Sequence, residues 1–322
     1  MEKIRKNIVI ILPVLIGLAY GLLMQFGIRN KFFVDTYGAM SIGFIFILPF
    51  LIGSITVYFG NEVQRKSWKY RITMPLLTSL LCMLCSFFTG LEGTICLFMA
   101  IPVYVPLAIL GGVITGIILS SIEQNKFHSM AFASLLFLPL ISNEMEKNFP
   151  LPDDFNLVKT QIFIEGTEQK VWNQIKRIPK ITEPQNSFFY TMGFPRPVEA
   201  TLSFNGIGGV REAKFEKGLL FLETIDVWEE NKKLGFKIKS DPNSTPLTTL
   251  DEHVMVGGKY FDALYGEYEI VKISETKVRL DLHSRYRLST RFNFYAELWG
   301  DFLMRDIQNN ILSVIKSRVE KN

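Results

Sequence analysis

The chain has 322 residues, of which 48% are hydrophobic and 20% are charged, with a formal net charge of +4 at pH 7 and a mean hydropathy of +0.21. Residues 1–143 hold 10 Lys and Arg against 5 Asp and Glu, whereas residues 144–322 hold 25 against 26. This composition excludes a wholly soluble enzyme, a disordered chain and a nucleic-acid-binding protein with a strongly basic domain.

Long uncharged runs fill the first part of the chain. A helix of about 20 apolar residues is long enough to cross the hydrocarbon core of a bilayer. We therefore expect an all-α transmembrane bundle of four or five helices in residues 1–143, followed by a linker at 144–157. The expected spans are 8–26, 37–60, 72–91, 95–121 and 127–143, of which the fifth is borderline because it is short and contains His128.

The Lys and Arg residues of the short loops predict the orientation of this bundle. Lys3, Arg5 and Lys6 precede the first span, and the loop at 61–71 carries four cations. Both segments are expected in the cytoplasm, in a multi-pass protein of the cell or inner membrane. If residues 127–143 span, the rest of the chain is extracytoplasmic. If they lie on the membrane surface, the rest of the chain is cytoplasmic.

The residues that usually carry metal or covalent chemistry are sparse. Cys82 and Cys85 form a C-x-x-C inside an apolar run, without the further Cys or His that a four-ligand metal site requires. The three histidines are far apart in the sequence, and no G-x-S-x-G, H-E-x-x-H or phosphate-binding glycine loop is found. The sequence therefore predicts no metal, no cofactor and no catalytic residue.

In the second part of the chain, apolar and polar residues alternate as they do in strands, and these segments lie between two amphipathic helices. A strand is expected at 158–164, then an amphipathic helix at 168–178 with Thr167 as its N-cap, and finally a long amphipathic helix at 293–321. Between the helices, strands are expected at 199–204, 210–217, 219–228, 233–240, 253–259, 265–273 and 277–288. Residues 158–322 therefore predict an α+β domain in which a curved antiparallel sheet surrounds one long terminal helix and leaves a cavity beside it.

Four short motifs occur in order within this domain. They are Ile164–Trp172, a strand end followed by a helix bearing Val-Trp, and residues 206–211, 221–228 and 266–270. In this order they resemble the START-like, or SRPBCC, helix-grip superfamily, which includes polyketide cyclase/dehydrase-like and lipid-transfer proteins. The resemblance covers about residues 158–320. It implies a helix-grip fold that binds a hydrophobic small molecule or lipid, and it implies no universal catalytic residue.

Strand parity predicts which side chains line the cavity, because alternate residues of a strand share one face. Six expected lining residues are polar or charged: Arg211, Glu223, His253, Tyr268, Ser284 and Tyr286. Because residues 219–228 are apolar on both faces, parity does not separate Glu223 from Asp226, and one of these two is expected to point into the cavity. Five are apolar: Phe215, Phe236, Leu280, Leu282 and, on the terminal helix, Phe302. A buried Arg211 would require a carboxylate or an anionic ligand head beside it. An ordinary structural role remains the alternative for each polar residue.

The predicted architecture favours a membrane-anchored binding module for a lipid or another hydrophobic small molecule, with lipid transfer as one such role. The alternatives are a cyclase- or hydratase-type enzyme acting on a hydrophobic substrate, and a ligand sensor coupled to the membrane bundle. The expected partners are the lipid bilayer and the hydrophobic ligand, and not a nucleic acid. The sequence specifies no oligomeric state.

Overall fold

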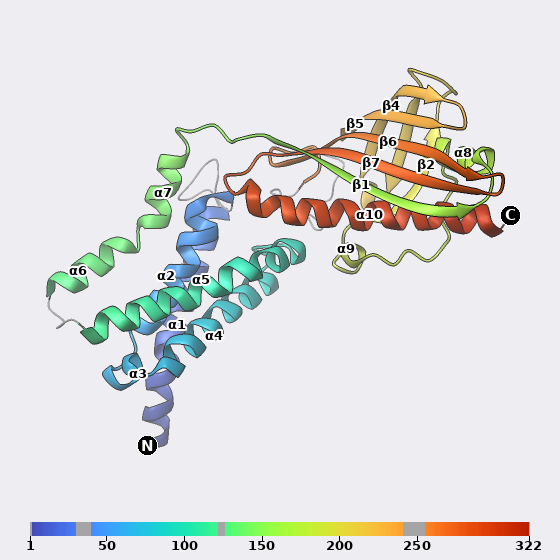
Figure 1. Cartoon of the computed structure of the whole chain (residues 1–322). Coiled ribbons are helices and arrows are strands. Elements are labelled where there is room, and N and C mark those ends of the chain that lie inside the picture. The colour runs from blue at the N-terminus through green and yellow to red at the C-terminus, as the bar shows by residue number, and fades with distance from the viewer. Residues whose placement is uncertain (1, 30–39, 122–125, 241–254, 322) are drawn as a thin grey trace. The chain divides into compact units, whose positions relative to one another are not determined.

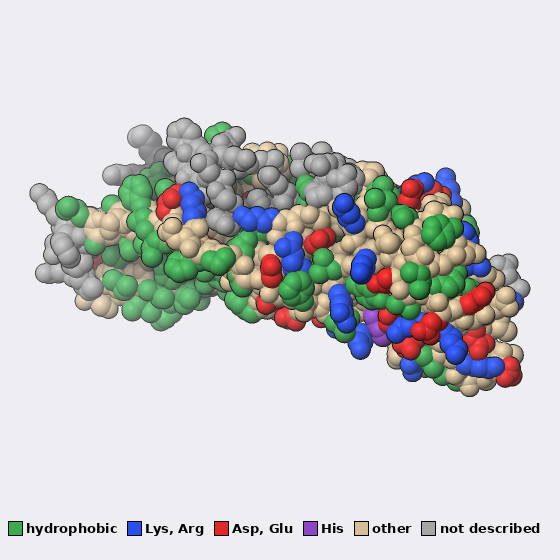
Figure 2. Space-filling view, turned by 90° about the horizontal axis from the view of Figure 1, so that it is seen from above, with side chains coloured by type: hydrophobic (Ala, Val, Ile, Leu, Met, Phe, Trp, Pro, Cys, Tyr) green, Lys and Arg blue, Asp and Glu red, His purple; other side chains and the backbone are tan. Residues whose placement is uncertain are grey.

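The computed structural model describes residues 2–29, 40–121, 126–240 and 255–321 (Figure 1). The chain divides into two compact units, Met1–Pro150 and Leu151–Asn322. Hydrophobic side chains dominate the visible surface of the first unit, whereas Lys, Arg, Asp and Glu side chains are interspersed over the second (Figure 2). The two halves of the sequence thus form units of different surface chemistry.

The first unit is helical. In chain order it contains α1 (Glu2–Arg29), the π-helix η2 (Gly43–Ile47), α2 (Leu48–Tyr58), α3 (Glu62–Lys66), α4 (Trp68–Phe88), α5 (Thr94–Ser121), α6 (Lys126–Leu135) and α7 (Leu138–Glu146). Among the described residues, two helices, α4 and α5, have the length and apolar composition to cross a membrane. Two shorter apolar helices cover residues 11–27 and 43–58. The bundle of four or five spans therefore remains a prediction.

Helix α2 lies at the centre of this unit, against α1, α4 and α5. Leu48 and Ile52 of α2 are fully buried. Gly53 permits the closest approach to α5, because a Cβ atom at this position would lie 1.7 Å from the carbonyl oxygen of Ala108. Small residues let helix backbones approach in this way in membrane bundles.

The segment predicted as the fifth span is not one continuous helix. It forms α6 and α7, which are separated by a turn at Leu136 and Phe137. The physical reason is Pro139, which lies in the first turn of α7, since proline cannot donate a backbone hydrogen bond to a preceding helical turn.

Helices α6 and α7 nevertheless contact the two ends of the η2–α2 segment. The ring of Phe132 in α6 stacks on Tyr58 at the end of α2, with a centroid distance of 3.9 Å. The Glu146 carboxylate at the end of α7 accepts hydrogen bonds from the backbone N–H groups of Ile42 and Gly43, at 3.1 and 3.3 Å. The α6–α7 pair therefore runs antiparallel to the η2–α2 segment.

The second unit contains one seven-stranded antiparallel sheet with the strand order β1-β7-β6-β5-β4-β3-β2. The strands are β1 (Asp154–Glu165), β2 (Pro197–Leu202), β3 (Val210–Phe215), β4 (Leu220–Glu229), β5 (Lys233–Ser240), β6 (Phe261–Ser274) and β7 (Lys277–Leu288). β1 begins inside the predicted linker, because residues 154–157 pair with residues 285–288 of β7.

The strand predicted at 253–259 is absent from the described part of that segment, 255–259. There Val256 makes a single bridge to Phe261, and the chain then turns at Gly257, whose φ of +80° lies in the left-handed region that favours glycine. Residues 253 and 254 lie outside the described residues.

Three α-helices accompany the sheet: α8 (Glu168–Lys176), α9 (Phe188–Thr191) and α10 (Asn293–Lys321), with a short 3₁₀ turn η3 (Glu216–Gly218) between β3 and β4. Thr167 caps α8 by accepting a hydrogen bond from the Lys170 N–H, as the sequence indicates. α10 runs along one face of the curved sheet and packs on β1, β7, α8 and α9 (Figure 1). This is the predicted helix-grip arrangement.

Candidate functional site

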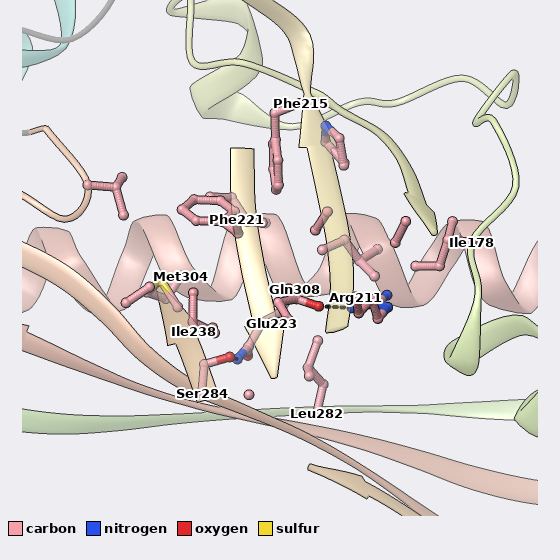
Figure 3. A pocket seen from close by; sticks show the side chains of 18 of the residues that line it. Ile178, Arg211, Phe215, Phe221, Glu223, Ile238, Leu282, Ser284, Met304 and Gln308 are labelled. Carbon is pink, nitrogen blue, oxygen red and sulfur yellow. Dashed lines mark hydrogen bonds and ion pairs between the residues drawn. The ribbon is translucent and has the colours of Figure 1, made fainter. Parts of the chain in front are cut away.

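A cavity lies between α10 and the inner face of the sheet. Its volume is about 120 Å³, and side chains from β2 to β7, α10 and the chain between α8 and β2 surround it. Most of the lining is apolar, including Ile178, Phe221, Ile238 and Met304 (Figure 3). An apolar cavity with a few polar groups is the usual form of a small-molecule site.

Strand alternation places two charged residues in this apolar lining. In β3 the buried positions are Arg211 and Ala213, while Glu212 between them is exposed. In β4 the buried positions are Glu223 and Ile225. Arg211 and Glu223 are direct partners in the β3–β4 register, so their side chains meet on the same face of the sheet.

Arg211 and Glu223 form an ion pair in which the side chains are only 3% and 8% exposed (Figure 3). The carboxylate that a buried Arg211 requires is therefore supplied by the protein itself. Burial raises the pKa of Glu223 although Arg211 acts in the opposite direction. Burial disfavours the charge of Arg211, but Glu223 and Tyr268 outweigh it and leave the pKa of Arg211 raised.

Two aromatic residues complete the surroundings of the Arg211 guanidinium. Its central carbon lies 5.3 Å from the centroid of the Phe236 ring, which is within range of a cation–π interaction. Burial also raises the pKa of the neighbouring Tyr268 hydroxyl, with Arg211 acting against the shift. The Nε of Arg211 is buried and has no hydrogen-bond partner among the residues that the structure describes. One buried donor beside the cavity wall is thus without a partner among the described residues.

A second polar group in the cavity lies where β7 meets α10. The side-chain amide of Gln308 donates to Ser284 Oγ at 2.8 Å, and the Thr160 hydroxyl donates to the side-chain oxygen of Gln308 at 2.9 Å. Both Ser284 and Gln308 line the cavity. Since Ser284 acts as the acceptor here, its hydroxyl proton can be donated to a ligand.

The structure brings seven of the eleven predicted site residues together around the cavity: Arg211, Phe215, Glu223, Phe236, Tyr268, Leu282 and Ser284. Whether they bind a ligand remains a prediction. His253 lies outside the described residues.

The other three predicted residues do not line the cavity. Leu280 is fully buried in the main core cluster of this unit. The Tyr286 hydroxyl donates to the Asp301 carboxylate at 2.8 Å. Phe302 is 42% exposed and packs against Phe188, because the face of α10 that lines the cavity carries Leu303, Met304 and Ile307 instead.

Gln308, Met304 and Phe221 also line the cavity but were not among the residues predicted from the sequence. The available signal was spacing, because Met304, Gln308 and Ile311 lie at i, i+4 and i+7 on one face of α10. Gln308 escaped notice because a polar residue in that stripe looks like a surface position, whereas it is 2% exposed and hydrogen-bonded on both sides.

A scan against protein-family models and a search of curated proteins found no match. Similar solved structures include truncated norcoclaurine synthase from Thalictrum flavum, at 8% identity, with 54% of this chain and 99% of that chain covered and a TM-score of 0.35. A START superfamily protein from Mycobacterium smegmatis has 11% identity, coverage of 51% and 97%, and a TM-score of 0.32. The Zhui aromatase/cyclase from Streptomyces sp. R1128 has 12% identity, coverage of 51% and 94%, and a TM-score of 0.33.

Proposed function

We propose that the unit Leu151–Asn322 binds a small hydrophobic molecule carrying an uncharged hydrogen-bond acceptor, and that the apolar helices of the first unit anchor it to a membrane. The observation that carries this proposal is the buried Arg211–Glu223 pair in the wall of an apolar cavity. Lipid transfer between membranes is one role that such an anchored binding unit would serve.

The charge of the pair argues for an uncharged ligand. Glu223 already neutralises Arg211, so a carboxylate or phosphate in the cavity would be a buried charge without a free counter-charge. The available donors are the Nε of Arg211 and the hydroxyl of Ser284. A ketone, ester or ether oxygen would accept from these donors without bringing a charge.

The volume of the cavity limits the size of this ligand. An apolar cavity of about 150 Å³ accommodates benzene, whereas drug-sized ligands occupy pockets of roughly 300–1,000 Å³. A volume of about 120 Å³ therefore suits a single ring or a short segment of a longer molecule. A longer lipid chain would require displacement of lining side chains, of which the unbranched Met304 is the most adaptable.

The proposed anchoring has five crossings, the last one being the broken α6–α7 pair. The loop after α2 is rich in Lys and Arg, which favours the cytoplasmic side. Phe132 contacts that end of α2, while Glu146 binds the opposite end, at Ile42 and Gly43. Breaks in membrane helices are tolerated where neighbouring helices cover them. These contacts support an extracytoplasmic location for the second unit.

The test compares two ligands of similar size and different charge. Acetophenone and benzoate, each titrated calorimetrically into the full chain in detergent, differ mainly in the carboxylate. We expect acetophenone to bind at least about tenfold more tightly, which corresponds to about 1.4 kcal/mol. Titration into detergent alone measures partitioning into micelles. Tighter binding of benzoate would contradict the proposal of an uncharged ligand, and saturable binding of neither probe would count against the cavity as a binding site for small hydrophobic molecules.

A second candidate function is an enzyme of the cyclase or hydratase type. The observation that favours it is Glu223, a buried carboxyl group in the cavity wall. Burial raises the pKa of this carboxyl group, and a shifted pKa is a common property of catalytic acids and bases. Turnover of a hydrophobic carbonyl compound by the wild-type chain, and its loss in Glu223→Gln, would favour this function over binding alone.

A further inference from the structure

The outer face of the sheet, opposite to the cavity, carries a compact group of metal-binding side chains. Glu267 of β6 and His283 of β7 are direct partners in the strand register, and Glu269 lies two residues further along the same face of β6. One potential ligand atom from each of the three residues lies within 4.8 Å of the others. Antiparallel pairing of β6 and β7 thus joins residues that the sequence separates.

The donor set is that of a divalent transition-metal ion. Imidazole nitrogen and carboxylate oxygen bind zinc at about 2.0–2.2 Å in tetrahedral geometry, which places ligand atoms about 3.4 Å apart. The His283 Nδ1 and a Glu267 oxygen are 3.8 Å apart already. Side-chain rotation that moves the glutamate oxygens by about 1 Å would bring the three ligand atoms to the distances that one ion requires. All three residues are partly exposed, so an ion and a completing water molecule have access.

A lysine competes for this position. Lys233 Nζ lies 3.1 Å from Glu267 Oε1, and its side chain is 31% exposed. The Tyr265 hydroxyl donates to the other oxygen of Glu267 at 3.2 Å. Lys233 also faces Glu269 in the β5–β6 register, Lys159 faces His283 in the β1–β7 register, and the charge of Arg279 acts on Glu269. A divalent ion competes with these cations, and the partly exposed Lys233 can turn toward solvent when the ion binds.

We propose that Glu267, Glu269 and His283 form a binding site for one zinc-type divalent ion on the outer face of the sheet. The ion would link β6 to β7 at the residues directly adjacent to the cavity lining. Tyr268 lies between the two glutamates and Ser284 follows His283, and both point into the cavity. A bound ion would therefore hold together the two strands that carry these polar groups. The proposal does not depend on the identity of the cavity ligand.

The test measures metal binding by the full chain in detergent after treatment with a chelator. Calorimetric titration with Zn²⁺ should show one ion per chain, and Co²⁺ should give a visible absorption band typical of the bound ion. His283→Ala should weaken Zn²⁺ binding at least about tenfold. Lys233→Met should strengthen it, because the competing ammonium is removed. Glu275→Gln, in the turn between β6 and β7, is the matched control and should bind as the wild type does.

Circular dichroism of each metal-free variant establishes that it is folded, and Glu269→Gln replaces His283→Ala should the latter fail this check. Unchanged Zn²⁺ affinity in a folded His283→Ala or Glu269→Gln variant would overturn the proposal, as would the lack of saturable binding by the wild type. Stronger binding by Lys233→Met together with weaker binding by His283→Ala would support it.

Discussion

Arg211 and Glu223 lie directly opposite each other on β3 and β4 and form an ion pair that is almost entirely buried beside the cavity. Removing two charges from water can cost more free energy than their mutual attraction in the interior returns, and apolar replacements are often at least as stable. The pair is therefore poorly explained by stability alone. Its location in the cavity wall is the observation on which the proposed function rests.

The first prediction separates the two partners of this pair. Arg211→Met leaves Glu223 buried without a counter-charge and should destabilise the protein by about 3–5 kcal/mol. Arg211→Met combined with Glu223→Leu should recover most of that loss, because no buried charge remains. Chemical unfolding of the full chain, followed by tryptophan fluorescence, measures both. A loss below about 1 kcal/mol for Arg211→Met would indicate that Glu223 is hydrated.

The second prediction concerns the attachment of α10 to the chain after α8. Arg318 donates to both carboxylate oxygens of Glu183, at 2.7 and 2.9 Å, and this contact lowers the pKa of Glu183 to about 2. Because the folded-state pKa is lowered, the contact stabilises the fold above the ordinary pKa of about 4.3 and ceases to do so as the pH falls toward 2.

Glu183→Gln should therefore lower the Tm at pH 7 and have little effect near pH 2. For a partly exposed pair the loss is about 1 kcal/mol, or about 2–4 °C in a unit of this size. Thermal unfolding of both proteins between pH 2 and pH 7 measures the difference. A Tm difference that is constant over this range would show that the ionised carboxylate is not what stabilises the contact.

The third prediction concerns topology. A reporter enzyme fused after Asn322 should lie outside the cytoplasm, since five crossings begin from a cytoplasmic N-terminus. The same reporter fused after Ser121 should lie inside, because four crossings precede it. A cytoplasmic signal from both fusions would mean that α6 and α7 do not cross the membrane, and that the contacts of Phe132 and Glu146 with the two ends of the η2–α2 segment do not both form.

Strand parity predicted the inner face of the sheet well, because a side chain in a regular strand has only two possible directions. Arg211 and Ser284 lie on the predicted face and in the cavity wall, and of the two alternatives Glu223 and Asp226, which parity did not separate, Glu223 lines the cavity. Parity specifies a face of the sheet and not a position along the strand. This explains why two other residues of β7 were predicted to line the cavity and do not. Leu280 and Tyr286 share the face of Ser284, but Leu280 is buried in the core cluster and Tyr286 donates to Asp301, so neither lines the cavity.

The sequence was less informative where packing between distant segments decides the structure. Phe302 shares a broad apolar face of α10 with Ile307 and Ile311, which predicts the inner side, whereas it packs on Phe188 and Phe189 of α9. The pairing of Arg211 with Glu223 and the grouping of His283 with Glu267 both depend on strand register. A single sequence determines register best where the turn between strands is short, so the pairing of Glu267 with His283 across the short β6–β7 turn was within reach of sequence reasoning, whereas the turn between β3 and β4 contains the irregular η3.

The last prediction tests whether the cavity is open space or close-packed core. Ala213 lies in β3 between Arg211 and Phe215, is 8% exposed and lines the cavity without a polar partner. In Ala213→Leu the larger side chain should extend into the cavity and abolish acetophenone binding. The fold should be spared, since the added atoms occupy vacant volume, and the Tm should stay within a few degrees of the wild type. Overpacking of a filled core would instead cost about 1–3 kcal/mol.

Thr224→Leu, on the exposed face of the adjacent strand β4, is the matched control and should retain binding. Retained binding in Ala213→Leu would place the ligand elsewhere, and a large fall in Tm would show that position 213 is ordinary core.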